Sequence, residues 1–129
     1  MATWNDVARL ALALPEATEA PTYGGARSWR VRDKVFAWER PLRRGDLAEL
    51  GDAVPSGPVL AARVPDVSAR DDLIADSPDV HFTTSHFAGY PTVLVRLDEI
   101  STAELAEVLE EAWRSRAPRR LVSDRDRAG

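Results

Sequence analysis

The stretch PDVHFTTSHFAGYPTVLVR, residues 78–96, decides the fold, because it leads into the clearest strand of the chain, residues 92–97. Both histidines, His81 and His86, precede this strand, and each is followed by a phenylalanine. A five-residue spacing places two side chains on opposite faces of a strand and on different faces of a helix, so they are poorly placed as neighbouring metal ligands. We interpret the histidine block as a packed connector that delivers the chain into the strand.

Upstream of this strand, hydrophobic periodicity and turn residues predict a helix, a β-hairpin and a third strand. The first helix begins at a capping box formed by Thr3 and Asp6 and ends before Pro15. The hairpin turns at the polar tripeptide Arg32-Asp33-Lys34. We predict a helix over residues 3–14, an irregular connection over 16–25, hairpin strands over 28–31 and 35–38, a loop with one helical turn over 41–58 and a strand over 59–64.

Two further helices are predicted on either side of the strand at residues 92–97. One begins near Ser68 and stops near Pro78, since the residue before a proline disfavours the helical conformation. The other begins at a capping box of Ser101 and Glu104, and its apolar residues recur at helical intervals as far as Trp113, which we expect in the core.

The order of the predicted elements is helix, hairpin, strand, helix, strand, helix. The strands follow one another too closely for repeated crossover connections, and this predicts an antiparallel α+β fold. Residues 1–121 are expected to form a single domain, and the polar residues 122–129 are expected to be a disordered tail.

The composition of the 129 residues is that of a globular protein, with 44% hydrophobic and 29% charged residues. The chain has no cysteine, which excludes disulfides, thiolate chemistry and cysteine-bound zinc. The N-terminus lacks a basic signal region, and the apolar run over residues 10–14 is too short to cross a bilayer. We therefore expect a cytoplasmic protein without a membrane partner.

The net charge of −4 is unevenly distributed along the chain. Residues 1–45 carry eight basic and five acidic side chains, residues 46–111 carry three and fourteen, and residues 112–129 carry six and two. This predicts a molecule with a basic and an acidic side. Sixteen of the seventeen basic residues are arginine, which makes bidentate contacts with phosphate or carboxylate, although a biased genomic composition also replaces lysine with arginine.

Several short motifs occur in order along residues 5–118. They are Leu14-Pro15-Glu16 with Pro21, Val31-Arg32-Asp33-Lys34-Val35-Phe36-Ala37, His81-Phe82 with His86-Phe87, Gly89-Tyr90-Pro91, and Ala112-Trp113-Arg114. Together these motifs resemble the MmcQ/YjbR family of small bacterial proteins. The resemblance implies a CyaY-like (frataxin-like) fold, in which an antiparallel sheet packs against helices in a two-layer sandwich.

The resemblance also implies DNA binding, because the architecture of the family is similar to a double-wing motif whose hairpins reach nucleic acid. That implication is an analogy from fold, and fold alone does not establish function. One branch of the family has a lysine or asparagine in the histidine block, where this chain has Thr84 and Ser85. A phosphate contact that the resemblance implies at this place is therefore missing.

The basic hairpin is the strongest candidate site, because basic side chains that alternate with aromatic ones can contact phosphates and stack on bases. We predict a non-enzymatic domain whose DNA binding is weak and salt-sensitive, since the acidic central region repels a polyanion. The alternative is that the arginines are the solvated face of a strand whose other face is core. The predicted phosphate contacts are Arg30, Arg32, Lys34, Arg43 and Arg44, and the predicted stacking partners are Trp29 and Trp38.

The second hypothesis is a small-molecule or peptide-binding pocket with a resistance or regulatory role, lined by His81, His86, Tyr90 and Trp38. No catalytic residue is assigned, because Ser85 next to His86 has neither the elbow motif nor the geometry of an activated nucleophile. Neither a metal nor a cofactor is expected. The glutamates at positions 104, 107 and 111 have the spacing of a solvated helix face.

Overall fold

The computed structural model describes residues 2–22 and 24–128, and its centre is a six-stranded sheet. All neighbouring strands in this sheet are antiparallel, and their order is β1-β2-β3-β4-β6-β5. The strands are β1 (Ala17–Pro21), β2 (Arg27–Val31), β3 (Lys34–Glu39), β4 (Val59–Arg63), β5 (His81–Phe82) and β6 (Thr92–Arg96).

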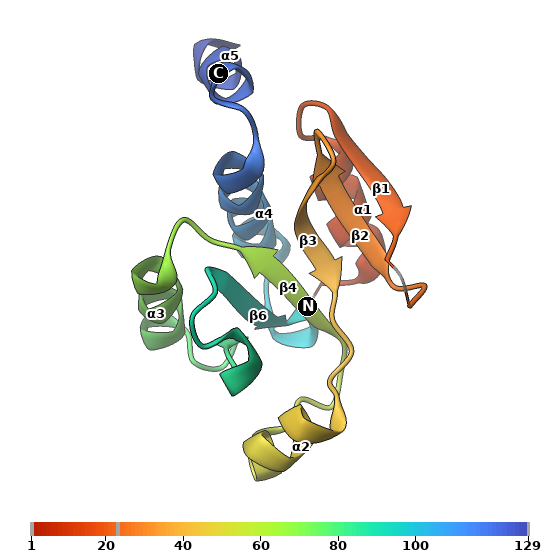
Figure 1. The fold of residues 1–129 in the computed structure, drawn as a ribbon, viewed down its shortest axis with the longest axis vertical. Coiled ribbons are helices and arrows are strands. Elements are labelled where there is room, and N and C mark those ends of the chain that lie inside the picture. Colours follow the sequence, from red (N-terminus) through yellow and green to blue (C-terminus); the bar gives the residue numbers. More distant parts are fainter. Residues whose placement is uncertain (1, 23, 129) are drawn as a thin grey trace.

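Helices cover both faces of the sheet to different extents (Figure 1). α1 and α4 bury their apolar sides against one face, where they form the main core. A smaller cluster on the other face joins Phe82 and Phe87 to Trp38 and to Leu50 of α2. The helices are α1 (Trp4–Leu12), α2 (Arg44–Leu50), α3 (Val67–Asp76), α4 (Thr102–Arg116) and α5 (Arg119–Ala128). Among the described residues, none of the helices combines the length and apolar character needed to span a bilayer.

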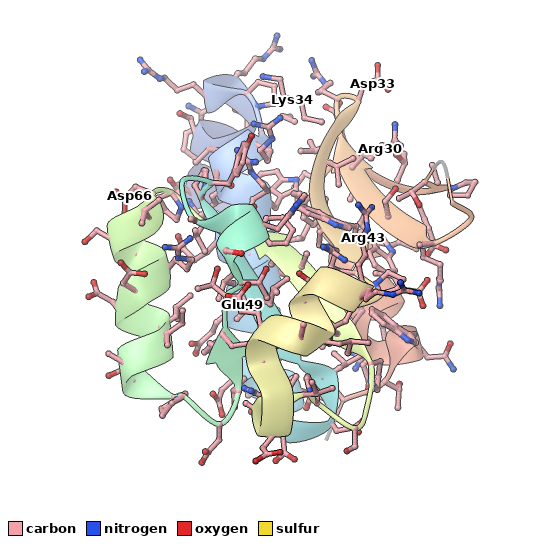
Figure 2. All side chains as sticks on the ribbon, turned by 60° about the horizontal axis from the view of Figure 1, so that its bottom comes forward. Arg30, Asp33, Lys34, Arg43, Glu49 and Asp66 are labelled. Carbon is pink, nitrogen blue, oxygen red and sulfur yellow. The ribbon has the colours of Figure 1, made fainter. Side chains whose placement is uncertain are left out.

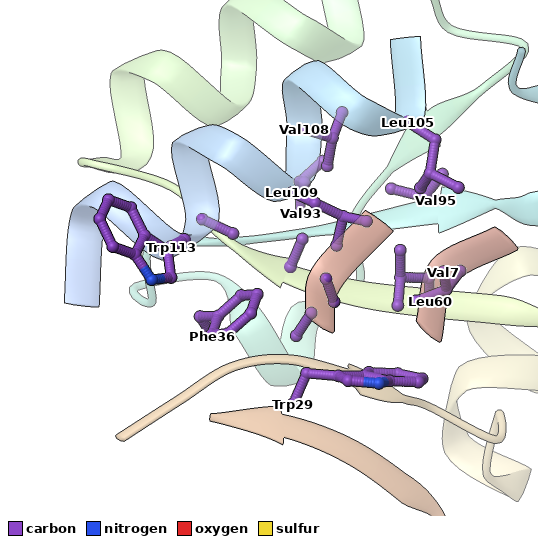
Figure 3. Close-up of a cluster of buried hydrophobic side chains, with 14 of the residues drawn as sticks. Val7, Trp29, Phe36, Leu60, Val93, Val95, Leu105, Val108, Leu109 and Trp113 are labelled. Atoms are coloured by element: carbon purple, nitrogen blue, oxygen red, sulfur yellow. The ribbon is translucent and has the colours of Figure 1, made fainter. Parts of the chain in front are cut away.

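The main core forms where α4 lies over the sheet (Figure 3). Trp29 from β2, Phe36 from β3 and Trp113 from α4 are all fully buried in it. The Trp113 indole Nε1 donates a hydrogen bond of 2.9 Å to the Pro15 carbonyl oxygen, so this large side chain is buried without an unpaired donor. The predicted α+β class and the core position of Trp113 are confirmed.

The predicted hairpin is confirmed, and it turns through two residues with positive φ, Arg32 at 50° and Asp33 at 66°. Two positive φ angles give a turn whose twist matches that of the flanking strands. β1 lies where an irregular connection was expected. Its residues show no regular alternation of buried and exposed positions, and pairing with β2, from Ala17 opposite Val31 to Pro21 opposite Arg27, fixes it as a strand.

The expectation of a disordered tail over residues 122–129 is corrected, because residues up to Ala128 belong to α5. Arg125 is ion-paired with Glu110 of α4 at 2.6 Å, and Arg114 with Asp126 at 2.7 Å. The composition of the tail alone does not indicate this helix, because the ion-pair partners lie on α4. Residue 129 lies outside the described residues.

Candidate functional site

A cavity of about 440 Å³ opens where β3 and β4 separate. The two strands pair only at three positions, from Ala37 opposite Ala62 to Glu39 opposite Leu60, so the start of β3 diverges from the end of β4. The C-terminal end of α4 reaches the same place. The residues around the cavity are Thr22, Asp33, Lys34, Val35, Trp38, Arg63 and Arg116.

Arg63 and Arg116 give this cavity its electrostatic character. Arg63 is the last residue of β4 and Arg116 is the last residue of α4. Neither takes part in an ion pair between described residues, and the Nε of each guanidinium is buried without a hydrogen-bond partner. Burial and the nearby charge of Arg116 both lower the pKa of Arg63. Two like charges with unused donors form a site that is complementary to an anion.

A second cavity, of about 350 Å³, shares Trp38 and Arg63 with the first. Its other lining residues include His86 and Tyr90, and Tyr90 is 60% exposed. The ring of His86 stands edge-on to that of Phe87, with 4.7 Å between the ring centroids. We call the two cavities together the arginine groove, defined by Lys34, Trp38, Arg63, His86, Tyr90 and Arg116.

The structure brings together three of the four residues predicted for a ligand pocket, namely Trp38, His86 and Tyr90. His81 is the exception, and its inclusion in that pocket is corrected. It lies in β5, it is buried, and it lines a different cavity between α3 and α4. The separation follows from the sequence, because His81 is in a strand whereas His86 lies five residues later in a 3₁₀ turn.

Trp29 cannot stack on nucleic-acid bases in this structure, and that assignment is corrected. Its side chain is fully buried, its ring stacks on Trp4 with 6.3 Å between centroids, and its Nε1 donates to a carboxylate oxygen of Glu19. Trp29 is in register with Ala37, and both side chains belong to the core that α1 and α4 cover. The predicted alternative, in which this side of the strand is core, therefore holds for Trp29.

The basic residues of the hairpin differ in how far they are already neutralised. Arg32 is ion-paired with Glu16, and Arg27 is ion-paired with Glu19 at 2.9 Å. Lys34 is exposed and Arg30 is partly buried. Figure 2 shows Asp33 and Lys34 at the projecting end of the hairpin.

Several basic residues after β3 lie at or near the N-terminal end of α2. Arg43, labelled in Figure 2, is the N-cap residue of α2. Arg44 is the first residue of that helix, and both side chains are exposed. Arg40 is buried and ion-paired with Asp46 at 3.1 Å. Burial opposes ionisation of Asp46, but the backbone N–H of Arg43 and the guanidinium of Arg40 hold the pKa of this carboxyl below its usual value.

Sequence reasoning missed Arg63 and Arg116. Arg63 closes an apolar strand and Arg116 follows the apolar stripe of the last long helix, so each looks like an ordinary solvated residue at the end of an element. They are more than fifty positions apart in the chain. Only the divergence of β3 from β4 brings them to one cavity, and no local motif signals that divergence.

Comparison with known proteins gives a match to the family model described as YjbR over residues 12–115. Uncharacterized proteins of Mycobacterium bovis and Mycobacterium tuberculosis are 50% identical to this chain over 126 residues, which is 95% of this chain and 94% of theirs. The crystal structure of Deinococcus radiodurans protein DR2400, with a DUF419 domain, aligns with a TM-score of 0.63 at 19% identity. That alignment covers 88% of this chain and 77% of the other, and it supports the fold.

Proposed function

This chain belongs to the YjbR family, and we propose that it is a non-enzymatic binding domain whose ligand is an anion held between Arg63 and Arg116. The observation that carries the proposal is the pair of guanidinium groups in one cavity, each with a buried Nε that lacks an acceptor. An unpaired buried donor costs free energy, and two adjacent positive charges add repulsion. A phosphate or carboxylate group between the two guanidinium groups relieves the repulsion, with the terminal nitrogens as donors, since the Nε atoms are closed to solvent.

The remainder of the arginine groove favours a ligand that carries a planar group beside its anionic one. Trp38 lines both cavities, and the largely exposed Tyr90 lies in the second. Aromatic side chains offer flat apolar surface to a ring. Lys34 adds a third positive charge to the first cavity and Asp33 adds one negative charge, so the lining keeps an excess of positive charge. His86 lines the second cavity and packs edge-on against Phe87, which places its ring beside the ligand.

A titration with phenyl phosphate tests this function. We expect the tryptophan fluorescence to change saturably, because Trp38 lies beside the bound ring, and inorganic phosphate to compete. Arg63→Gln and Arg116→Gln should each weaken binding by about tenfold or more, which corresponds to loss of one charge-assisted contact. Arg9→Gln removes an exposed arginine of α1 and should leave the affinity unchanged. Equal weakening by Arg9→Gln, or no saturable binding, contradicts the proposal.

DNA is the second candidate ligand, and the position of Lys34 favours it. Lys34 stands at the projecting end of the hairpin and also lines the arginine groove, so a phosphate backbone that follows the hairpin would reach Arg63 and Arg116. Arg30, Arg43 and Arg44 stay in this proposal as phosphate contacts, and Trp38 as the stacking partner. Arg32 is already paired with Glu16 and contributes less.

Titration of single-stranded and duplex DNA at low and at moderate salt tests the second candidate. We expect weak binding that is lost as salt rises, because phosphate neutralisation is its source. Lys34→Gln should reduce the slope of log affinity against log salt by about one. Absence of binding at low ionic strength eliminates DNA and leaves the small anionic ligand.

A further inference from the structure

A cavity of about 240 Å³ on another part of the molecule has the opposite charge to the arginine groove. It lies between α3, β5 and α4, and four carboxylates line it. Asp76 is the last residue of α3, whereas Glu104, Glu107 and Glu111 follow one another along α4. The three glutamates are exposed, as expected for a solvated helix face, and in the structure this face also borders the cavity.

His81 is the feature that a solvated acidic face does not explain. Its side chain is 4% exposed and lines this cavity, and its Nδ1 is buried without a hydrogen-bond partner among the described residues. Burial lowers the pKa of His81 more than the charge of Glu104 raises it, so the imidazole is neutral at pH 7. A neutral imidazole has one acceptor nitrogen, which a ligand N–H group can use.

The carboxylates are available to a ligand to different degrees. The hydroxyl of Ser101 donates to a Glu104 carboxylate oxygen as part of the helix cap. Glu107, Glu111 and Asp76 take part in none of the ion pairs between described residues. Glu107 and Glu111 are four residues apart on α4, which puts them about one helical turn, or about 6 Å, from each other.

The distances between these carboxylates indicate which kind of cation fits the cavity. Among the described residues, no three histidine or carboxylate side chains come close enough to hold a metal ion. Leu73 and Val108 add apolar surface to the same cavity. An extended cation with charges at both ends and an apolar middle therefore fits better than a compact one.

We propose that this cavity binds a small alkyl diammonium ion, with Glu107, Glu111 and Asp76 pairing its charged ends and the ring of His81 accepting a hydrogen bond. The alkyl chain lies against Leu73 and Val108. The site is separate from the arginine groove, so its ligand and its test are independent of the anion proposed above.

The test uses 1,4-diaminobutane on the full chain, with 1,4-butanediol as the uncharged molecule of similar shape. We expect calorimetry to show saturable binding of the diamine, and nitrogen NMR to show a shift of the His81 ring signals with the same midpoint. The diol should produce neither signal. Glu107→Gln combined with Glu111→Gln should weaken diamine binding by about tenfold or more, since two charge-assisted contacts are lost.

The matched control is Asp52→Asn combined with Glu99→Gln, which removes two exposed carboxylates that lie outside this cavity. We expect the control to bind the diamine as the unmodified protein does. Equal loss in both double variants would mean that the diamine responds only to net charge and would overturn the proposal. Failure of the diamine to move the His81 ring signals, or equal binding of the diol, would also overturn it.

Discussion

Arg40 and Arg63 carry the same charge but face different surroundings. Arg40 is buried against Asp46, so its charge is compensated, whereas Arg63 faces Arg116 and has no anionic partner among the described residues. A charge that contributes to stability is usually paired, and an unpaired one at a cavity is typical of a functional site. The effect of substitution on the free energy of unfolding should therefore differ between these two arginines.

We expect Arg40→Gln to lower the free energy of unfolding by about 3 kcal/mol, because it leaves the buried Asp46 carboxylate uncompensated. Arg63→Gln should change that free energy by less than about 1 kcal/mol, since the loss of its contacts is offset by relief of repulsion from Arg116. Urea unfolding of both variants measures the difference. Equal destabilisation would show that Arg63 has a structural role.

His81 makes the stability depend on pH. Its pKa is lowered in the folded protein, so the unfolded chain takes up a proton at a higher pH than the folded protein does. The contribution to stability is therefore present above the unfolded pKa of about 6.5 and falls below it, by at most about 1.4 kcal/mol per pH unit. In the His81→Gln variant, the free energy of unfolding should depend less on pH between pH 7 and pH 5.5, which denaturation at several pH values measures. The same pH dependence in the variant and the unmodified protein would contradict the burial of a neutral ring.

Helices and strands with a clear pattern in their own residues were predicted correctly from the sequence. The apolar run of β6, the polar turn of the hairpin and the stripe that ends at Trp113 in α4 are local patterns, and the structure contains all three elements. β1 and α5 depend on partners elsewhere in the chain, β2 for the former and α4 for the latter. β1 lacks a regular alternation of buried and exposed residues, and the residues of α5 are strongly polar, so neither element was predicted.

The same reasoning applies to the candidate sites. Trp38, His86 and Tyr90 were found from residue type, the first in the hairpin and the other two in the histidine block. Arg63, Arg116 and the link between His81 and the acidic face of α4 follow from the packing of segments far apart in the chain. The spacing of residues within a single sequence does not show which distant segments pack together.

Trp113→Ala should lower the free energy of unfolding by about 3 to 5 kcal/mol, because it removes a fully buried indole from the contact between α4 and the sheet. It also leaves the Pro15 carbonyl without its donor. Chemical denaturation measures this change. A loss below about 1 kcal/mol would contradict the packing shown in Figure 3.

Glu110→Gln should loosen the contact between α5 and α4 without unfolding the domain. Glu110 accepts hydrogen bonds from both Arg114 and Arg125, and these side chains are partly exposed, so each pair contributes at most about 1 kcal/mol. We expect amide exchange to rise across residues 119–128, and unfolding of the rest to change little. The same rise should occur in the unmodified protein at high salt, because salt screens these pairs.

The whole molecule has a charge gradient along α4. Glu104 lies in the first turn of this helix, whereas Arg114 and Arg116 lie in its last turn, which is the favourable arrangement for the helix dipole. The acidic cavity contacts the N-terminal half of α4, and the arginine groove contacts its C-terminal end. Two cavities whose lining residues differ in charge therefore lie along one helix.

The short pairing between β3 and β4 has a mechanical consequence. Three residue pairs join β1, β2 and β3 to the remaining strands, whereas β4 and β6 are joined by five. α4 contacts both β3 and β4 and so connects the two halves on the core side. We expect the softest collective motion to be a hinge rotation of these halves about α4. An anion bound between Arg63 of β4 and Arg116 of α4 would join one of these halves to the hinge helix and would stiffen the motion.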